Sequence, residues 1–514
     1  MDNIYLIDYL NETLSIIEYK HINKMNKSDK FIVNLGYINL DIIKVINRYP
    51  NIIGLNINWY IDTNKLNMLN KMKYMKLNMC DSIDDVSMLK DCIELYIINC
   101  KGINDVSMLG NVKKLNLSGC VNVKDVSMLG NCEELDLTGC INVTDVSNLG
   151  NVKRLNLTGC VNVRDVSMLG KCIELNLSEC VNVTDVSNLG NVKKLNLYGL
   201  SKLIDVSMLG NCEELDLSYC FKISDVSKLL YVKRLTLKSL YNIKDVSMLG
   251  NCEYLDLSGC DEIKNVSKLG NVKELYLSGC FKVTDVSNLT NVKKLYLDSN
   301  FNLKDVSALG NCEELDLTDC EKISDVSKLY KVKKLNLSNC KLIKDYSMLA
   351  NEELTMCRMK KNIDISKLKK IKKLNLSRCD IINLTHLPNC EELDLSHCDG
   401  FTDVSMLGNI KKLNLTYCCE ITDVSALGNV EELDLTYCLK LEDVSALGNV
   451  KKLKISKCDR ITDVSMLGKC IELDISGCKN IKDVSKLGDV KKINISKCKG
   501  IDISNLMNCE IIID

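Results

Sequence analysis

The chain repeats one pattern about every twenty residues, and this repeat constrains its fold more than any other feature. The motif Asp-Val-Ser-x-Leu begins at Asp85 and recurs at twenty-residue steps as far as Asp345, with Asn265 in place of the Asp in one repeat and Tyr346 in place of the Val in the last. The step then shortens to nineteen residues at Asp364 and later returns to twenty, and the last motif begins at Asp502. Such a chain needs no single large core, because each unit packs mainly on its neighbours. The sequence therefore predicts an array of about 23 units over residues 45–514.

One unit, VKKLNLSGCVNVKDVSMLGN, shows how a repeat is expected to pack. Leu115 and Leu117 flank the polar Asn116, which is the alternation of a half-buried strand. Asp125 is placed where its carboxylate can accept hydrogen bonds from the N–H groups of a short helical turn. Gly130 then allows the chain to bend back toward the next strand. A single unit cannot bury its apolar side alone, whereas a stack of units buries it continuously.

These residues resemble the leucine-rich repeat superfamily, through the consensus VxxLxLxxC followed by DVSxL. The Cys of the consensus is similar to that of the cysteine-containing subclass found in F-box proteins, and the DVSxL half is similar to internalin-like repeats. Uniform arrays rich in Asn, Ile and Lys also resemble the leucine-rich-repeat gene families of large DNA viruses such as entomopoxviruses. The resemblance implies an α/β solenoid: a horseshoe with a long parallel sheet on its concave face and short turns or 3-10 segments on its convex face.

The 29 cysteines fall mostly into two columns with spacings that are multiples of twenty. The first column is Cys100, Cys120, Cys140, Cys160, Cys180, Cys220, Cys260, Cys280, Cys320 and Cys340. The second column is Cys92, Cys132, Cys172, Cys212, Cys252 and Cys312. We expect buried structural thiols that donate weak hydrogen bonds to loop carbonyls. There is no CxxC motif and there are only three histidines, so we expect no zinc site and no cofactor.

The overall charge is balanced, with 67 Lys and Arg against 68 Asp and Glu and a net charge of −1. A nucleic-acid or anionic-membrane ligand would favour a basic excess, so we expect neither. No apolar run reaches the roughly 18 residues of a membrane span. The N-terminus lacks the pattern of a signal peptide, and glycosylation sequons such as Asn116-Leu-Ser118 fall within the strands. These features predict a cytoplasmic protein.

The charge before the central Leu alternates from one repeat to the next. The residues concerned are Lys114, Glu134, Arg154, Glu174, Lys194, Glu214 and Arg234. In-register stacking places position i beside position i+20, so each charge should face an opposite one across the ladder. The alternation also opposes a slip by one repeat, which would pair like charges. We interpret it as a device for register and solubility.

The alternation changes phase in the segments NVKELYLSGC and NVKKLYLDSN of residues 271–300. Two tyrosines fall side by side on the predicted sheet here, and Asn300 replaces the usual Cys. Aromatic side chains beside charges are typical anchors of protein interfaces. The alternative is a neutral trace of repeat duplication. The predicted protein-binding residues are Tyr254, Tyr276, Lys294, Tyr296 and Asp298.

The N-terminal residues 1–44 do not follow the repeat. Ile7, Leu10, Leu14 and Ile17 are spaced to share one helical face, which predicts a helical cap over the first strand. The alternative, by analogy with F-box proteins, is a degenerate F-box-like module, although it lacks a Leu-Pro opening. At the other end the chain stops within a predicted strand, whose edge can pair with another chain; we otherwise expect a monomer.

The sequence favours a non-catalytic scaffold that binds a protein partner through the concave sheet, with a viral, host-directed role suggested by the resemblance. An enzyme needs convergent titratable groups in a pocket, whereas these charges and thiols are periodic and explained by their columns. The alternative hypothesis is an F-box-like substrate receptor of a ubiquitin ligase. The identity of the partner does not follow from the repeat, because this repeat specifies a fold and not an activity.

Overall fold

The chain divides into two compact units, unit 1 (Met1–Glu262) and unit 2 (Ile263–Asp514). The computed structural model describes residues 4–8, 30–35, 52–59, 61, 63–359, 368, 371–380, 384, 390–398, 400–506 and 509–513.

Unit 1 contains a parallel sheet in which each strand pairs with the next strand along the chain. From β6 onward, each strand residue lies opposite the residue twenty positions further on. The strands are β1 (Ile4–Asp8), β2 (Lys30–Leu35), β3 (Ile52–Asn58), β4 (Tyr74–Asn78), β5 (Glu94–Ile98), β6 (Lys114–Asn116), β7 (Glu134–Asp136), β8 (Arg154–Asn156), β9 (Glu174–Asn176), β10 (Lys194–Asn196), β11 (Glu214–Asp216), β12 (Arg234–Thr236) and β13 (Tyr254–Asp256).

Unit 2 has the same parallel order, again with sequential strands as neighbours. Where the repeat shortens to nineteen residues, the register is kept, so that Lys334 lies opposite Glu353. The strands are β14 (Glu274–Tyr276), β15 (Lys294–Tyr296), β16 (Glu314–Asp316), β17 (Lys334–Asn336), β18 (Glu353–Thr355), β19 (Lys373–Asn375), β20 (Glu392–Asp394), β21 (Lys412–Asn414), β22 (Glu432–Asp434), β23 (Lys452–Lys454), β24 (Glu472–Asp474), β25 (Lys492–Asn494) and β26 (Glu510–Ile512).

The return segments form short helical turns, and among the described residues no helix has the length and apolar character needed to cross a membrane. Unit 1 contains the helix α3 (Thr63–Asn67) and the 3-10 turns η1 (Ser87–Leu89), η2 (Ser107–Leu109), η3 (Ser127–Leu129), η4 (Ser147–Leu149), η5 (Ser167–Lys171), η6 (Ser187–Leu189), η7 (Ser207–Leu209) and η8 (Ser247–Leu249). Unit 2 contains η9 (Ser307–Leu309), η10 (Leu329–Lys331), η12 (Ser405–Leu407), η13 (Ser425–Asn429), η14 (Ser445–Asn449) and η15 (Ser465–Leu467).

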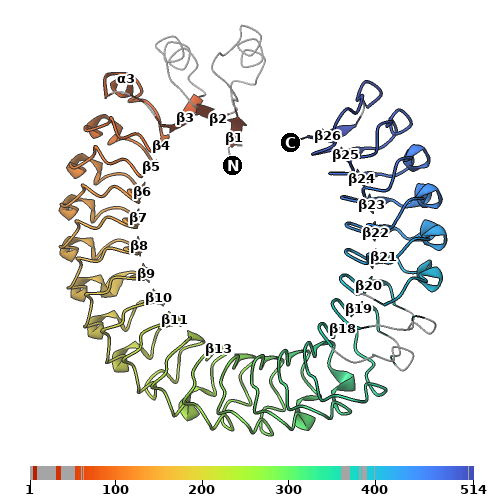
Figure 1. Ribbon diagram of the computed structural model, residues 1–514. Coiled ribbons are helices and arrows are strands. Elements are labelled where there is room, and N and C mark those ends of the chain that lie inside the picture. Colours follow the sequence, from red (N-terminus) through yellow and green to blue (C-terminus); the bar gives the residue numbers. More distant parts are fainter. Residues whose placement is uncertain are drawn as a thin grey trace. The chain divides into compact units, whose positions relative to one another are not determined.

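Within each unit the strands lie on the concave side of the curve and the 3-10 turns lie on its convex side (Figure 1). This arrangement confirms the predicted fold class, a leucine-rich-repeat solenoid with a parallel sheet on its concave face and 3-10 turns on its convex face.

The core of each unit consists of columns of equivalent side chains, as the repeat predicted. In the repeat analysed above, every predicted inward position is at most 2% exposed. These positions are Val112, Leu115, Leu117, Cys120, Val123, Val126 and Leu129. Burying one such Leu contributes about 1.5–3 kcal/mol, and stacking lets every repeat bury the apolar side of its neighbour.

The predicted role of Asp125 is confirmed, whereas the predicted reason for Gly130 is wrong. Asp125 Oδ1 accepts a hydrogen bond of 2.9 Å from the backbone N–H of Ser127, the first residue of η3. Gly130 has a φ of −64°, which any residue adopts. A Cβ atom at Gly130 would instead lie 2.2 Å from the carbonyl oxygen of Asn148 in the next repeat. Close approach between repeats, and not backbone freedom, therefore favours glycine in this slot.

The N-terminal segment differs from the helical prediction in the part that the structure describes. Residues Ile4–Asp8 form strand β1, so Ile7 lies in a strand and not on a helical face. Strand β1 pairs with β2, and β2 pairs with β3, so the ladder includes strands from within residues 1–44. Leu10, Leu14 and Ile17 lie outside the described residues. The boundary at residue 45 stays a prediction.

Candidate functional site

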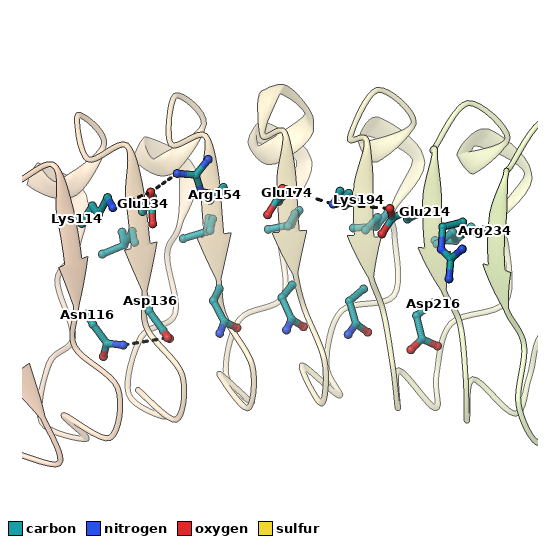
Figure 2. A pocket seen from close by; sticks show the side chains of 18 of the residues that line it. Lys114, Asn116, Glu134, Asp136, Arg154, Glu174, Lys194, Glu214, Asp216 and Arg234 are labelled. Atoms are coloured by element: carbon teal, nitrogen blue, oxygen red, sulfur yellow. Dashed lines mark hydrogen bonds and ion pairs between the residues drawn. The ribbon is translucent and has the colours of Figure 1, made fainter. Parts of the chain in front are cut away.

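The concave face of unit 1 carries two rows of side chains, one from the first and one from the third position of each strand (Figure 2). The side chains between these rows are buried Leu residues. The first row, here named the charge row, comprises Lys114, Glu134, Arg154, Glu174, Lys194, Glu214 and Arg234. The second row, here named the Asn/Asp row, comprises Asn116, Asp136, Asn156, Asn176, Asn196 and Asp216. Unit 2 has equivalent rows.

Ion pairs connect neighbouring members of the charge row, as the alternation predicted. In unit 1, Lys114 Nζ lies 3.3 Å from Glu94 Oε1 and 3.7 Å from Glu134 Oε1. On its other side, Glu134 accepts a hydrogen bond from Arg154. All these side chains are partly exposed, so each pair contributes no more than about 1 kcal/mol.

The charge row of unit 2 alternates from Glu274 to Glu510 without a break in the paired strands. Lys373 Nζ, for example, lies 3.8 Å from Glu353 and 3.4 Å from Glu392. A slip by one repeat would bring like charges together along the whole row. The charge row therefore supports register, and its own positive and negative charges nearly balance.

The Asn/Asp row ends each strand. Asn116 Oδ1 accepts hydrogen bonds from the backbone N–H of Ser118 at 2.8 Å and from its hydroxyl at 2.6 Å. Asn116 Nδ2 donates to Asp136 Oδ2 at 3.1 Å, and Asp136 Oδ1 accepts from Thr138 N–H at 2.9 Å. These side chains are thus engaged in turning the chain, which leaves them with fewer polar atoms for a ligand.

A groove runs along the concave face of each unit. In unit 1 its lining extends from Tyr96 to Tyr254, and in unit 2 from Glu353 to Ile512. Both linings combine buried Leu positions with interspersed charges of both signs. A groove of this kind suits an extended polar ligand such as a protein segment better than a small charged substrate.

The predicted tyrosine pair lies in unit 2, where Tyr276 and Tyr296 replace the usual Asn or Asp. Their rings stack with centroids 4.3 Å apart and planes 6° apart. The Tyr276 hydroxyl donates to Glu274 Oε1 at 2.7 Å. Burial, followed by the hydrogen bond to Glu314, raises the pKa of Tyr296 to about 12. Both residues are half-buried, and each ring covers a face of the other.

Lys294 and Asp298 belong to the same pair of repeats as the tyrosines. Lys294 Nζ lies 3.8 Å from Glu274 Oε2, the carboxylate whose other oxygen accepts from Tyr276. Asp298 accepts a hydrogen bond from the hydroxyl of Ser278. The structure therefore joins Lys294 to the tyrosine pair through a shared carboxylate, while Asp298 contacts the adjacent strand end.

Tyr254, the fifth predicted site residue, belongs to unit 1. The Arg234 guanidinium carbon lies 4.5 Å from the centroid of the Tyr254 ring, which is cation–π geometry. The Tyr254 hydroxyl lies 3.5 Å from Asp256 Oδ2 as a hydrogen-bond donor. Tyr254 thus occupies the next position of the charge row. By the alternation this position should hold an acidic residue opposite Arg234, and the Tyr254 ring takes its place.

The exception in the Cys column has a structural explanation. Asn300 is fully buried, and its Nδ2 donates to the carbonyl oxygens of Leu277 and Leu297, each at 2.8 Å. In the next repeat, Cys320 Sγ donates to the carbonyl of Leu297 at 3.1 Å. The amide therefore replaces the thiol as a donor in the same column, although its Oδ1 has no hydrogen-bond partner in the described chain.

The prediction of buried thiols that donate to loop carbonyls is confirmed. Cys140 Sγ, for example, donates to the carbonyl of Leu117 at 3.1 Å. Burial raises the pKa of Cys160 to about 12 and, in the second column, the pKa of Cys132 to about 11. Among the described residues, no group of three or more His, Cys, Asp and Glu side chains is placed to hold a metal ion.

One column escaped the sequence analysis: the residue directly before the Cys column, here named the strand-end slot. Its backbone is left-handed, with a φ of +70° at Gly139 and +62° at Tyr417. In unit 2 the slot holds a ring stack, with His397 and Tyr417 at 4.4 Å and Tyr417 and Tyr437 at 4.3 Å between centroids. The available signal was the repeated Thr-Tyr-Cys of residues 416–418 and 436–438, where several other repeats, such as those that end at Cys120, Cys140 and Cys160, have Gly before Cys.

A second aromatic cluster lies in unit 1 and was also missed. Tyr198 and Tyr219 have ring centroids 5.1 Å apart, Tyr219 and Phe221 6.0 Å, and Phe221 and Tyr241 5.7 Å. Each of the four side chains is at least 36% exposed. The residues occupy different slots of neighbouring repeats, so no single column of the sequence shows them as a group.

The in-register parallel strands, the buried Leu and Cys columns and the 3-10 return turns together define a leucine-rich-repeat solenoid. No protein-family model matches the chain, and no curated protein matches it either. Solved structures with similarity include an internalin, InlF, from Listeria monocytogenes, at 20% identity and a TM-score of 0.30, covering 64% of this chain and 83% of that one.

Two further structures show comparable similarity. The functional domain of InlJ from Listeria monocytogenes, which includes a cysteine ladder, is 19% identical with a TM-score of 0.37, over 64% of this chain and 75% of that one. A leucine-rich-repeat protein of Leptospira interrogans is 16% identical with a TM-score of 0.30, over 93% of this chain and 99% of that one. At these TM-scores the similarities support no functional conclusion, and the assignment of the fold rests on the repeat geometry itself.

Proposed function

We propose that the chain is a non-catalytic scaffold that binds a protein partner on the concave face of unit 2, with Tyr276 and Tyr296 as the anchor. The observation that carries this proposal is the stacked ring pair in the Asn/Asp row. The equivalent Asn and Asp side chains turn the chain, whereas the tyrosines add a rigid amphipathic surface that the turn does not need. Such aromatic side chains dominate the binding energy of protein interfaces.

The state of the titratable groups favours binding over catalysis. The charge row is neutralised by its own neighbours across the ladder. Most thiols of the Cys column are protonated at neutral pH, because burial raises the pKa of groups such as Cys160 to about 12, and the thiolate is the nucleophilic form. Cys100 is the exception, since its hydrogen bond with Cys80 lowers its pKa. A catalytic site needs an activated nucleophile or a base near neutral pKa, and the paired charge row and the thiols of raised pKa supply neither.

The alternative hypothesis, a substrate receptor of a ubiquitin ligase, assigns ligase recruitment to residues 1–44. Strand β1 lies in that segment, and an F-box-like module is helical, so this part of the segment does not support the alternative. The remainder of residues 1–44 that would form its helices lies largely outside the described residues. A viral, host-directed role likewise stays a prediction from the sequence resemblance.

The test is affinity capture of partners by the full chain from the cells that contain the protein, compared with a variant carrying Tyr276→Ala and Tyr296→Ala. The matched control carries Phe281→Ala and Phe301→Ala. These phenylalanines come from the same two repeats and also stack, with centroids 5.6 Å apart, but they follow the Cys column and lie off the strands. Circular dichroism verifies that both variants remain folded.

A partner that is captured by the wild type and the phenylalanine variant, and lost with the tyrosine variant, supports the concave-face site. Retention of every partner by the tyrosine variant would contradict it. Ubiquitin-ligase subunits among the partners of the full chain would instead favour the substrate-receptor hypothesis. The expected loss for the tyrosine variant is at least about tenfold in bound partner, because interface hot spots contribute about 2 kcal/mol or more.

A further inference from the structure

The strand-end slot of unit 2 carries an uninterrupted run of basic and aromatic residues over six consecutive repeats. This run, here named the basic–aromatic stripe, comprises Arg358, Arg378, His397, Tyr417, Tyr437 and Lys457. All six have a left-handed φ between +57° and +63°. The six residues therefore occupy the same place in successive repeats and follow one another along the strand ends.

The three rings at the centre of the stripe stack on each other, so the ring faces between them are not accessible to a ligand. His397, Tyr417 and Tyr437 stack at 4.4 and 4.3 Å, with planes 13° and 11° apart. At this spacing the ring faces are in van der Waals contact with each other. A ligand can therefore contact only the ring edges, the tyrosine hydroxyls and the imidazole, and the hydroxyls and the imidazole can form hydrogen bonds. Tyr417 is 37% exposed, so the stack is accessible from the solvent side.

The two arginines of the stripe lack the acidic partners that neutralise the charge row. Arg358 and Arg378 are exposed, and among the described residues no carboxylate forms an ion pair with either of them. Two acidic residues close in sequence to the stripe form ion pairs with other lysines. Glu420 Oε2 lies 2.6 Å from Lys440 Nζ, and Asp459 Oδ2 lies 2.7 Å from Lys479 Nζ. The pKa of Asp459 is lowered mainly by Lys479, with a smaller contribution from Lys457.

Lys457 occupies the last slot of the stripe, and its side chain extends over Gly477 of the next repeat. With the two arginines at the other end, positive charge flanks the ring stack on both sides. Adjacent repeats are about 4.8 Å apart at the strands, so the stripe extends over about 24 Å. An extended peptide rises about 3.3 Å per residue, so about seven residues would cover this length.

We propose that the basic–aromatic stripe binds an acidic, extended peptide segment of a partner protein. Carboxylates would pair with Arg358, Arg378 and Lys457, and would accept hydrogen bonds from the tyrosine hydroxyls between them. A single-stranded nucleic acid fits less well, because its bases need open aromatic faces, whereas both faces of Tyr417 and one face each of His397 and Tyr437 are occupied by neighbouring rings. This inference goes beyond the proposed function and does not rest on it, since the stripe lies at the strand ends and not in the sheet rows.

The test is fluorescence anisotropy of the full chain with a fluorescein-labelled peptide of alternating Glu and Ser, about ten residues long, at low salt. We expect saturable binding with a Kd of about 100 µM or tighter that weakens as salt is raised. Arg358→Gln with Arg378→Gln should weaken binding about tenfold. Tyr417→Phe with Tyr437→Phe keeps the stack and removes the hydroxyls, and should weaken it about threefold.

The matched control is Lys412→Gln with Lys452→Gln, which changes the net charge equally but removes cations of the charge row that are paired with Glu432 and Glu472. We expect this variant to change the affinity by less than about twofold. An equal loss in the control and the arginine variant would show a general charge effect and overturn the proposal. Equal binding of the matching Gln and Ser peptide, or tighter binding of an oligothymidylate of similar length, would also overturn it.

Discussion

The strand-end slot carries different side chains in two regions of the molecule, a glycine run in unit 1 and the basic–aromatic stripe in unit 2, although unit 1 also has Glu179 and Tyr219 in this slot. In unit 1 three consecutive repeats place Gly119, Gly139 and Gly159 in the strand-end slot, with φ between +70° and +73°. In unit 2 the equivalent slots at Arg378 and Tyr417 have φ of +59° and +62°. A left-handed conformation costs a residue other than glycine roughly 1 kcal/mol. The fold therefore requires the conformation and not the side chain, so the stripe of unit 2 is not explained by the needs of the repeat.

In both units the residue after the strand-end slot belongs to the Cys column, and the comparison requires it to be equally buried. The reactivity of these thiols tests this requirement, and it is the prediction with the largest expected effect. Burial raises the pKa of Cys160 in unit 1 and of Cys458 in unit 2 from the ordinary 9.0 to about 12. Each should hold about a thousandfold less thiolate than an ordinary thiol at a given pH. N-ethylmaleimide at neutral pH, read by mass spectrometry, should modify the half-buried Cys419 well before either. Clearly different rates for Cys160 and Cys458 would refute equivalent burial, and a rate for either that equals the rate of Cys419 would refute its burial.

Truncation of the buried Leu column should also affect both units equally. Leu157 and Leu415 are both 0% exposed. We expect Leu157→Ala and Leu415→Ala each to lower the free energy of unfolding by about 3 kcal/mol, because each leaves a cavity between repeats. Urea unfolding measures the loss, with Lys171→Gln at an exposed position as the control. A much smaller loss in one unit would show that the two cores differ, and not only the strand-end slots.

A smaller effect is expected for substitutions in the convex turns. One repeat of the chain naturally has Asn265 in place of the Asp, and it serves as the reference for Asp145→Asn. Asp145 Oδ1 accepts from Ser147 N–H at 2.9 Å, and Asn265 makes the equivalent bond to Ser267 at 3.0 Å. Asp145→Ala should lower the midpoint of thermal unfolding by about 2 °C, and Asp145→Asn by less.

The dependence on pH separates these two Asp145 variants further. The hydrogen bond from Ser147 lowers the pKa of Asp145 in the folded chain. Its contribution to stability is therefore present above the unfolded pKa and is lost as the pH falls through the lower folded pKa. The advantage of the wild type over Asp145→Asn should therefore shrink progressively when melting is repeated at pH values below about 4, the unfolded pKa of an Asp. An advantage that is unchanged at acidic pH would contradict this assignment.

The smallest expected effect concerns the strand-end slot itself. A Cβ atom at Gly139 would meet nothing closer than 3.9 Å, so Gly139→Ala should cost only the left-handed backbone energy, about 1 kcal/mol. Tyr437→Gly should change the stability by less than about 0.5 kcal/mol, because relief of the backbone energy offsets the lost ring stack. Chemical unfolding measures both. A large loss with Tyr437→Gly would mean that the stripe is a structural element, and would weaken the peptide-binding proposal.

Much of the concave face could be predicted from the sequence, since in-register stacking assigns each side chain its neighbours. Opposite charges at positions 114 and 134 had to face each other once the repeat was known, and the structure pairs them. The half-burial of Tyr276 could not be predicted, because the register places it beside Tyr296 but does not set how closely the two rings overlap. The reason for Gly130 was also missed, because the atom that excludes a side chain belongs to the following repeat.

The sequence by itself determined the repeat length, the buried columns and the alternation of charge, because a periodic chain that stacks in register repeats its environment with its period. Only the tertiary structure decided how side chains of neighbouring repeats lie against each other. The stack of His397, Tyr417 and Tyr437 needs a left-handed backbone at every slot and a common ring orientation. Neither is visible in a pattern of residue types, because both arise from backbone dihedrals and from contacts between repeats.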